Sequence, residues 1–123
     1  MNQRSRLWGW VPVTSVISAL LLVYVSWLTA FLQLGRRPIP SMDDPKFLGG
    51  YSSVISSVCS KVILALLLCW AASLLGMIVF SLLPKTEDRA YWWKHVALGL
   101  AAMFLLFGSA HYSPGDAVTW FLD

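Results

Sequence analysis

Charged residues are scarce in this sequence, and their scarcity excludes an ordinary water-soluble domain. Only 12% of the 123 residues are Asp, Glu, Lys or Arg, whereas a soluble globular domain has about 25%. Hydrophobic residues make up 58% of the chain, and the mean hydropathy is +0.68. A soluble protein of this size has too little interior to bury so much apolar surface. We therefore expect an integral membrane protein, in which lipid solvates the outer surface.

Histidine and cysteine are rare, which argues against a metal or haem site. The two histidines, His95 and His111, are sixteen residues apart, or about 24 Å along a helix, so they cannot hold one ion together. The two cysteines, Cys59 and Cys69, are ten residues apart, or roughly 15 Å on a helix, which is beyond the reach of a disulfide. We expect no cofactor and no metal, and we interpret both cysteines as small packing side chains.

No carboxylate lies inside a long apolar run, so the sequence offers no acid–base pair within the membrane. Asp43 and Asp44 are adjacent in a proline-rich segment, where we expect them to cap a turn or to balance the nearby arginines. Ser57 and Lys61 are four residues apart and would touch on a helix. Ser–Lys pairs occur in catalysis, but a satisfied polar surface explains this pair more simply. The residue types predict a protein that is not an enzyme.

Three apolar runs are long enough to cross a bilayer as helices. They cover about residues 11–34, 62–83 and 92–110, and about 20 residues suffice for a hydrocarbon core of about 30 Å. The sequence therefore predicts an all-α fold, in which a small bundle of three transmembrane helices forms a single domain over residues 1–123.

Polar segments flank and connect these runs. A basic start precedes the first run, which is too long for a cleaved signal peptide and lacks an A-x-A site, so we expect a retained signal anchor. A proline-rich loop with Pro38, Pro40 and Pro45 joins the first and second runs. The C-terminal segment is too short to span a bilayer, and we expect Trp120 and its apolar neighbours to hold it at the membrane interface.

The second run has a serine-rich extension on its N-terminal side. We expect one continuous helix that begins near Ser52 and includes the charge-free stretch 62–83. Ser52, Ser56 and Ser60 share one side of this helix, and Lys61 follows them directly. These four residues form a candidate polar surface, termed the serine face below.

Small side chains line another side of the second helix. Ala65, Cys69, Ala72 and Gly76 follow each other at steps of four, three and four residues. Such a row, termed the small seam below, lets another helix approach closely in lipid. We therefore predict that this helix is the central one and that its small seam receives the first or the third helix. Comparable rows occur on the other two helices: Ser15, Ala19, Leu22, Ser26, Thr29 and Gln33 on the first, and Ala97, Ala101, Phe104 and Gly108 on the third.

Positive residues divide almost evenly between the two sides of the membrane. The N-terminal segment and the second loop carry Arg4, Arg6, Lys85, Arg89 and Lys94, and the first loop and the serine-rich extension carry Arg36, Arg37, Lys46 and Lys61. The C-terminal tail has aspartates and no cation, which favours a cytoplasmic N-terminus in a plasma or inner membrane. The net charge of +3 suits anionic lipid head groups. No basic patch is interleaved with aromatic residues, so nucleic acid is not an expected partner.

These expectations favour a non-enzymatic accessory or assembly subunit, which packs through its small seams against a larger membrane complex or against itself. An oligomeric pore, or a small transporter or holin-like component, is the first alternative, with the serine face or the hydroxyl row of the first helix as its lining. A membrane-bound enzyme is the second alternative. The expected partners are the lipid bilayer and either another membrane protein or a second copy of the chain.

Overall fold

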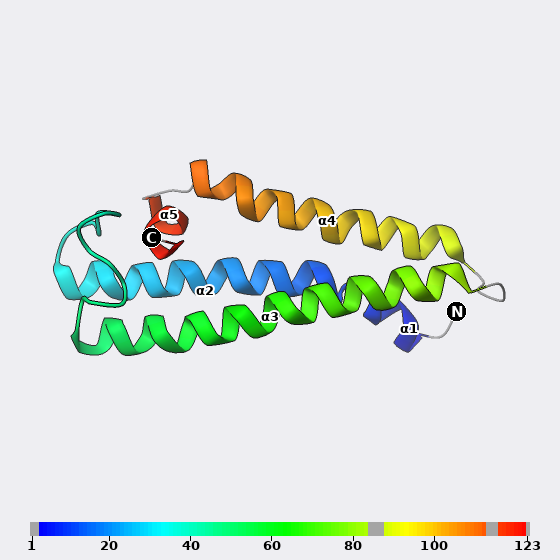
Figure 1. Cartoon of the computed structure of the whole chain (residues 1–123), viewed down its shortest axis with the longest axis horizontal. Coiled ribbons are helices and arrows are strands. Elements are labelled where there is room, and N and C mark those ends of the chain that lie inside the picture. Colours follow the sequence, from blue (N-terminus) through cyan, green and yellow to red (C-terminus); the bar gives the residue numbers. More distant parts are fainter. Residues whose placement is uncertain (1–2, 84–87, 113–115, 123) are drawn as a thin grey trace.

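The computed structural model describes residues 3–83, 88–112 and 116–122, and within these ranges the chain is helical without any strand. The helices are α1 (Gln3–Trp8), α2 (Val11–Leu34), α3 (Gly50–Leu82), α4 (Arg89–Tyr112) and α5 (Ala117–Leu122) (Figure 1). Helices α2, α3 and α4 are long and apolar enough to cross a bilayer. This confirms the predicted all-α fold with three candidate transmembrane helices, which is the fold of an integral membrane protein.

The central helix of the bundle is α2, because α3, α4 and α5 all pack against it. Of its most apolar window, 33% is buried inside the chain, against 11% for the corresponding window of α3. The predicted hydroxyl row of α2 faces this interior: Ser26 and Ala30 are fully buried, and Ala19 is nearly so. The prediction that the second transmembrane helix is central is therefore wrong.

The ends of α2 follow from local sequence. Pro12 lies in the first turn, where its missing N–H leaves no hydrogen bond unmade. Gly35 ends the helix with a left-handed backbone at φ 64°, and its N–H donates to the carbonyl oxygen of Phe31 over 3.0 Å. A glycine adopts this conformation without steric cost, which makes it a preferred C-terminal cap.

The N-terminus of α3 depends on a side chain from α2. Gln33 Oε1 accepts a 2.9 Å hydrogen bond from the Ser52 backbone N–H, and Gln33 Nε2 donates to the carbonyl oxygen of Gly49 over 3.0 Å. The first N–H groups of a helix have no partner within it, so Gln33 satisfies one of them from outside. Helix α3 begins at Gly50, which agrees with the expected start near Ser52.

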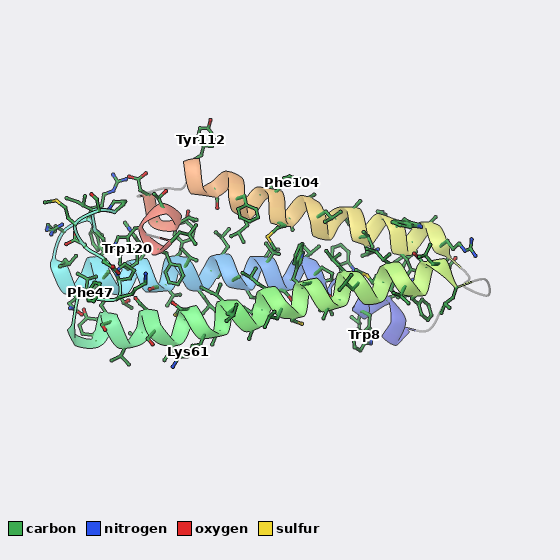
Figure 2. All side chains as sticks on the ribbon, viewed as in Figure 1. Trp8, Phe47, Lys61, Phe104, Tyr112 and Trp120 are labelled. Atoms are coloured by element: carbon green, nitrogen blue, oxygen red, sulfur yellow. The ribbon has the colours of Figure 1, made fainter. Side chains whose placement is uncertain are left out.

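Helices α2 and α4 run in the same direction but are offset along α3 (Figure 1). Pro12, near the start of α2, lies against Gly99 in the middle of α4. Ser26, in the second half of α2, is hydrogen-bonded to Ser56 in the first part of α3. Lys61 is exposed and points away from α2 and α4 (Figure 2).

The proline-rich loop and α5 close the end of the bundle where α2 ends. Arg36 donates two hydrogen bonds to the carboxylate of Asp43, at 2.7 and 2.9 Å, and the Ile39 N–H donates a third at 2.8 Å. Trp120 Nε1 donates to the carbonyl oxygen of Asp43, so α5 is held against the loop. Trp120 is completely buried within the protein, which corrects the expectation that this ring sits at the membrane interface.

The pKa of Asp43 lies below its ordinary value, chiefly because of the hydrogen bonds from Arg36 and secondarily because of the Ile39 N–H. Only 7% of Asp43 is exposed, so the carboxylate depends on these donors for its solvation. The expectation that this aspartate balances a nearby arginine is confirmed.

The crossing of α4 over α2 and α3 requires a glycine. A Cβ atom on Gly99 would lie 2.9 Å from Pro12 Cβ and 2.9 Å from Leu74 Cδ2. The Gly99 carbonyl group also takes part in this contact, because Trp70 Nε1 donates to its oxygen over 3.0 Å. Beyond the crossing, Leu74, Met77, Trp92 and Val96 form the buried cluster between α3 and α4.

We predict that Gly99→Ala destabilises the bundle by about 1 to 3 kcal/mol, because the added methyl group must displace the rigid Pro12 ring. Gly108→Ala is the matched control, since no atom lies within 4 Å of its Cβ position. Both changes bring the same gain in helix propensity. The free energies of unfolding, measured by SDS titration from a mild detergent and followed by circular dichroism, should differ by the cost of the clash. Equal stability of the two variants would contradict the close crossing.

We predict that the Arg36–Asp43 pair makes stability depend on pH in the acid range. The pKa of Asp43 in the folded state lies below the ordinary 3.8, so the pair stabilises the fold above that pH and ceases to do so as the pH falls through the folded-state pKa. Asp43→Asn should be less stable than wild type at neutral pH and should lack this acid-dependent loss. Asp116→Asn is the control, because its ion pair with Arg37 is 57% exposed on both sides and contributes little.

Candidate functional site

The small seam of α3 lies on the surface of the chain. Ala65, Cys69, Ala72 and Gly76 are all exposed, and no atom lies within 4 Å of the Gly76 Cβ position. The expectation that the first or third helix packs on this seam is therefore wrong within a single chain. The row of small residues on α4, which includes Ala97, Ala101, Phe104 and Gly108, is exposed as well.

Helical geometry explains why the seam faces outward. At 100° per residue, the buried positions of α3 fall within a narrow arc that runs along its whole length: Ser52, Ser56, Cys59, Leu74, Met77 and Ser81. The centre of the small seam lies roughly 140° around the helix from the centre of this arc. A straight helix that turns its serines toward α2 must turn its small seam away from it.

Three seam residues, Cys69, Ala72 and Gly76, line an apolar groove of about 470 Å³. Its other lining residues come from α1, α2, α3 and α4 and are mostly large: Trp8, Val11, Ser73, Met77, Phe80 and Trp92. Trp92 is buried and stands edge-to-face against Phe80, with 5.4 Å between the ring centroids. Small residues thus leave a hollow along α3 that aromatic side chains border.

The serine face is divided between the interior and the surface. Ser52 and Ser56 are buried between α2 and α3, whereas Ser60 and Lys61 are exposed. The hydroxyl groups of Ser26 and Ser56 share a buried hydrogen bond of 2.6 Å. Ser60 donates to the Ser56 carbonyl oxygen over 2.8 Å, within its own helix. The Ser56 hydroxyl group therefore joins two helices, and its partner is already Ser26.

The remaining candidate groups do not gather at one place. Ser57 and Lys61 are both exposed, and no hydrogen bond joins them in the described part of the chain. Cys59 is buried and Cys69 is exposed, and both are free. No group of three His, Cys, Asp or Glu side chains among the described residues could hold a metal ion.

Two features of the structure were not predicted from the sequence. One is the border of the groove, to which Trp8, Phe80 and Trp92 contribute from three different helices. The other is His95, which is only 3% exposed. The tryptophans beside the ends of the apolar runs were the available clue to the groove, but no local spacing relates Trp8 to Trp92.

We predict that the Ser26–Ser56 hydrogen bond couples α2 to α3. Ser26→Ala and Ser56→Ala should each lower the free energy of unfolding by about 1 kcal/mol, because each leaves one buried hydroxyl without its partner. The double variant should lose less than the sum of the two single losses, by about 0.5 to 1.5 kcal/mol. Ser57→Ala, at an exposed position of the same helix, is the control. Strict additivity of Ser26→Ala and Ser56→Ala would show that this bond does not stabilise the pair.

Comparison of this chain with models of protein families, with curated proteins and with solved structures finds no match.

Proposed function

We propose that this chain is a non-enzymatic accessory or assembly subunit, whose exposed small seam receives a transmembrane helix of a larger membrane complex or of a second copy. The observation that carries the proposal is the exposure of Ala65, Cys69, Ala72 and Gly76 along one side of α3, three of them in an apolar groove. Each small residue removes side-chain bulk from the surface of the helix, so a second backbone can approach closely there.

The physics of helix association in lipid supports this proposal. Lipid chains are as apolar as leucine, so transmembrane helices gain little from the hydrophobic effect when they associate. They gain instead from close van der Waals packing at rows of small residues. The groove offers such a row together with larger lining side chains, among them Trp8, Val11, Phe80 and Trp92.

The proposed orientation places the N-terminus in the cytoplasm and retains the first transmembrane helix as a signal anchor in a plasma or inner membrane. Five cations on the N-terminal side stand against four on the other, and the C-terminal tail carries none. The exposed side chains of Arg6, Arg89 and Lys94 lie at the end of the bundle where α1 and α4 begin, which is the cytoplasmic end in this proposal.

The alternative, an oligomeric pore lined by the serine face, meets a structural obstacle. Ser52 and Ser56 face α2 and are buried, so they would line a pore only if α2 and α3 came apart. Such a separation would break the Ser26–Ser56 bond and the Gln33 contacts at the start of α3. We therefore favour the assembly role over the pore.

We predict that Gly76→Leu weakens the complex about tenfold, because the new side chain fills the groove and holds a partner helix away. The measurement is the fraction of protein in a larger complex, or crosslinked through the exposed Cys69, after extraction in a mild detergent. Gly108→Leu is the matched control, since Gly108 is an exposed glycine on α4 outside the groove.

A wild-type chain that is cleanly monomeric and gives no Cys69 crosslink would contradict the assembly role. An intact complex in the Gly76→Leu variant would instead show that the partner binds elsewhere on the surface.

A further inference from the structure

Lys61 is the only charged residue of α3, and it lies on the side of that helix that faces away from the rest of the chain (Figure 2). At 100° per residue, it lies roughly 170° around the helix from the centre of the buried arc of α3. Its side chain is exposed, and no hydrogen bond or ion pair joins it to another residue in the described part of the chain. The ammonium group of Lys61 is therefore without a partner among these residues.

The pairing of α2 with α3 sets the depth of Lys61. Ser26 and Ser56 are hydrogen-bonded, so they lie at one level, and the two helices run in opposite directions (Figure 1). Lys61 lies five residues beyond Ser56, or about 7.5 Å. The midpoint of α2 (Val11–Leu34) lies about 5 Å from Ser26 in the same direction. Lys61 is therefore at the level of the α2 midpoint to within about 2 Å.

Exposed apolar side chains indicate that the hydrocarbon core covers this level. Leu28 and Leu32 on α2, and Val58 and Leu64 on α3, are all exposed, and a bilayer centred on the stretch 62–83 of α3 would leave the two leucines of α2 in water. A bilayer centred on α2 covers all four and leaves Lys61 about 15 Å from either edge of the core. The four-carbon stem of lysine is too short to carry the ammonium group over that distance to the head groups.

The surface beside Lys61 offers a second donor and a place for close approach. Ser57 lies four residues before Lys61, on the same side of α3. Its side chain is exposed and has no hydrogen bond to the described residues. Ala65 lies four residues after Lys61 and begins the small seam, whose centre is roughly 50° around the helix from Lys61. A helix that packs on the seam therefore passes beside Ser57 and Lys61.

A carboxylate is the group that suits these two donors. An ionisable side chain within a membrane pairs with a group of opposite charge or lines water. A carboxylate has two acceptor oxygens, so one can accept from the Lys61 ammonium group and the other from the Ser57 hydroxyl group. A phosphate of a lipid head group lies too far away, about 15 Å from the middle of the core.

The sequence excludes a second copy of this chain as the source of the carboxylate at this depth, because α2, α3 and α4 contain no Asp or Glu. We propose that the helix received by the small seam belongs to a different membrane protein and carries an Asp or Glu near the middle of its span, paired with Lys61 and Ser57. This inference rests on the assembly role proposed above, and it narrows the partner to a transmembrane helix with an internal carboxylate.

The test measures binding of synthetic transmembrane peptides to the purified full-length protein in phosphatidylcholine vesicles, by energy transfer between labels on the two N-termini. The first peptide is a Leu–Ala helix with Glu at its centre, the second has Gln there, and the third has the Glu moved two turns toward one end. The protein should bind the first about tenfold more tightly than the other two, the scale of a hydrogen bond between charged groups. Equal binding of the first and second peptides overturns the proposal. Equal binding of the first and third shows that Lys61 lies at the interface, and overturns it as well.

Variants at Lys61 connect this preference to its side chain. Lys61→Met keeps a long side chain without the charge, and it should abolish the preference for Glu while leaving binding of the Gln peptide unchanged. Lys46→Met, at another exposed lysine, in the proline-rich loop, is the matched control and should retain the preference. Lys61→Glu should reverse it in favour of a peptide with Lys at its centre. A preference for Glu that survives in Lys61→Met contradicts the pairing.

Gly76→Leu separates this inference from the assembly role. It should weaken binding of the Glu and Gln peptides alike, because it fills the groove at a place about 22 Å along α3 from Lys61. Unchanged binding of both peptides contradicts the seam and with it the assembly role. Equal binding of the two peptides to a wild-type protein whose Gly76→Leu variant is weakened contradicts only the pairing with Lys61.

A change of lipid distinguishes the carboxylate from a head-group phosphate. Replacing half of the phosphatidylcholine by phosphatidylglycerol should leave the preference for the Glu peptide unchanged. Loss of the preference would show that Lys61 reaches anionic head groups, and would overturn the proposal.

Discussion

The close pairing of α2 with α3 is the interaction on which the rest of the structure depends. Small and hydroxyl-bearing residues on α2, such as Ala19, Ser26 and Ala30, are buried, and their small side chains let the two backbones come together. The Ser26–Ser56 bond and the Gln33 cap then set the register of the pair. Such hydrogen bonds between transmembrane helices are individually modest in energy, but their directionality fixes how the two helices pair.

The surface that we assign to partner binding is a consequence of this pairing. Helix α3 packs on α2 through the side that carries its buried serines. Its small seam, which lies roughly 140° around the helix, therefore faces outward and is available for contacts outside the chain. The same pairing places the start of α2 at the middle of α4, so that Gly9 and Trp10 meet His95.

Features encoded locally could be predicted from the sequence. The three transmembrane helices follow from run length and hydropathy, and the end of α2 follows from Gly35. The central position of α2 could not be read from small-residue spacing, because all three helices carry such rows and spacing alone does not say which rows meet. A helical wheel shows that the serine face and the small seam lie too far apart around α3 for both to face the same neighbouring helix.

Contacts between distant parts of the chain were beyond sequence reasoning. Gln33 caps a helix that begins seventeen residues later, and Trp120 bonds to the Asp43 carbonyl oxygen across most of the chain. Each pairing requires the loop geometry that Pro38 and the Arg36–Asp43 pair create. The buried environment of His95 likewise depends on Gly9 and Trp10, which lie between α1 and α2, and no spacing within α4 encodes that contact.

The offset between α2 and α4 has a consequence for the surrounding lipid. Pro12 is the second residue of α2 but lies beside Gly99, the eleventh residue of α4, so the two helices are displaced by nine residues, or roughly 13 Å. A bilayer centred on one helix is mismatched to the other, and the lipid must thin or thicken around the chain at a cost of fractions of a kcal/mol per Å. The molecule therefore presents a stepped hydrophobic boundary, whose energy changes with the thickness of the membrane and can sort the protein among membranes that differ in it.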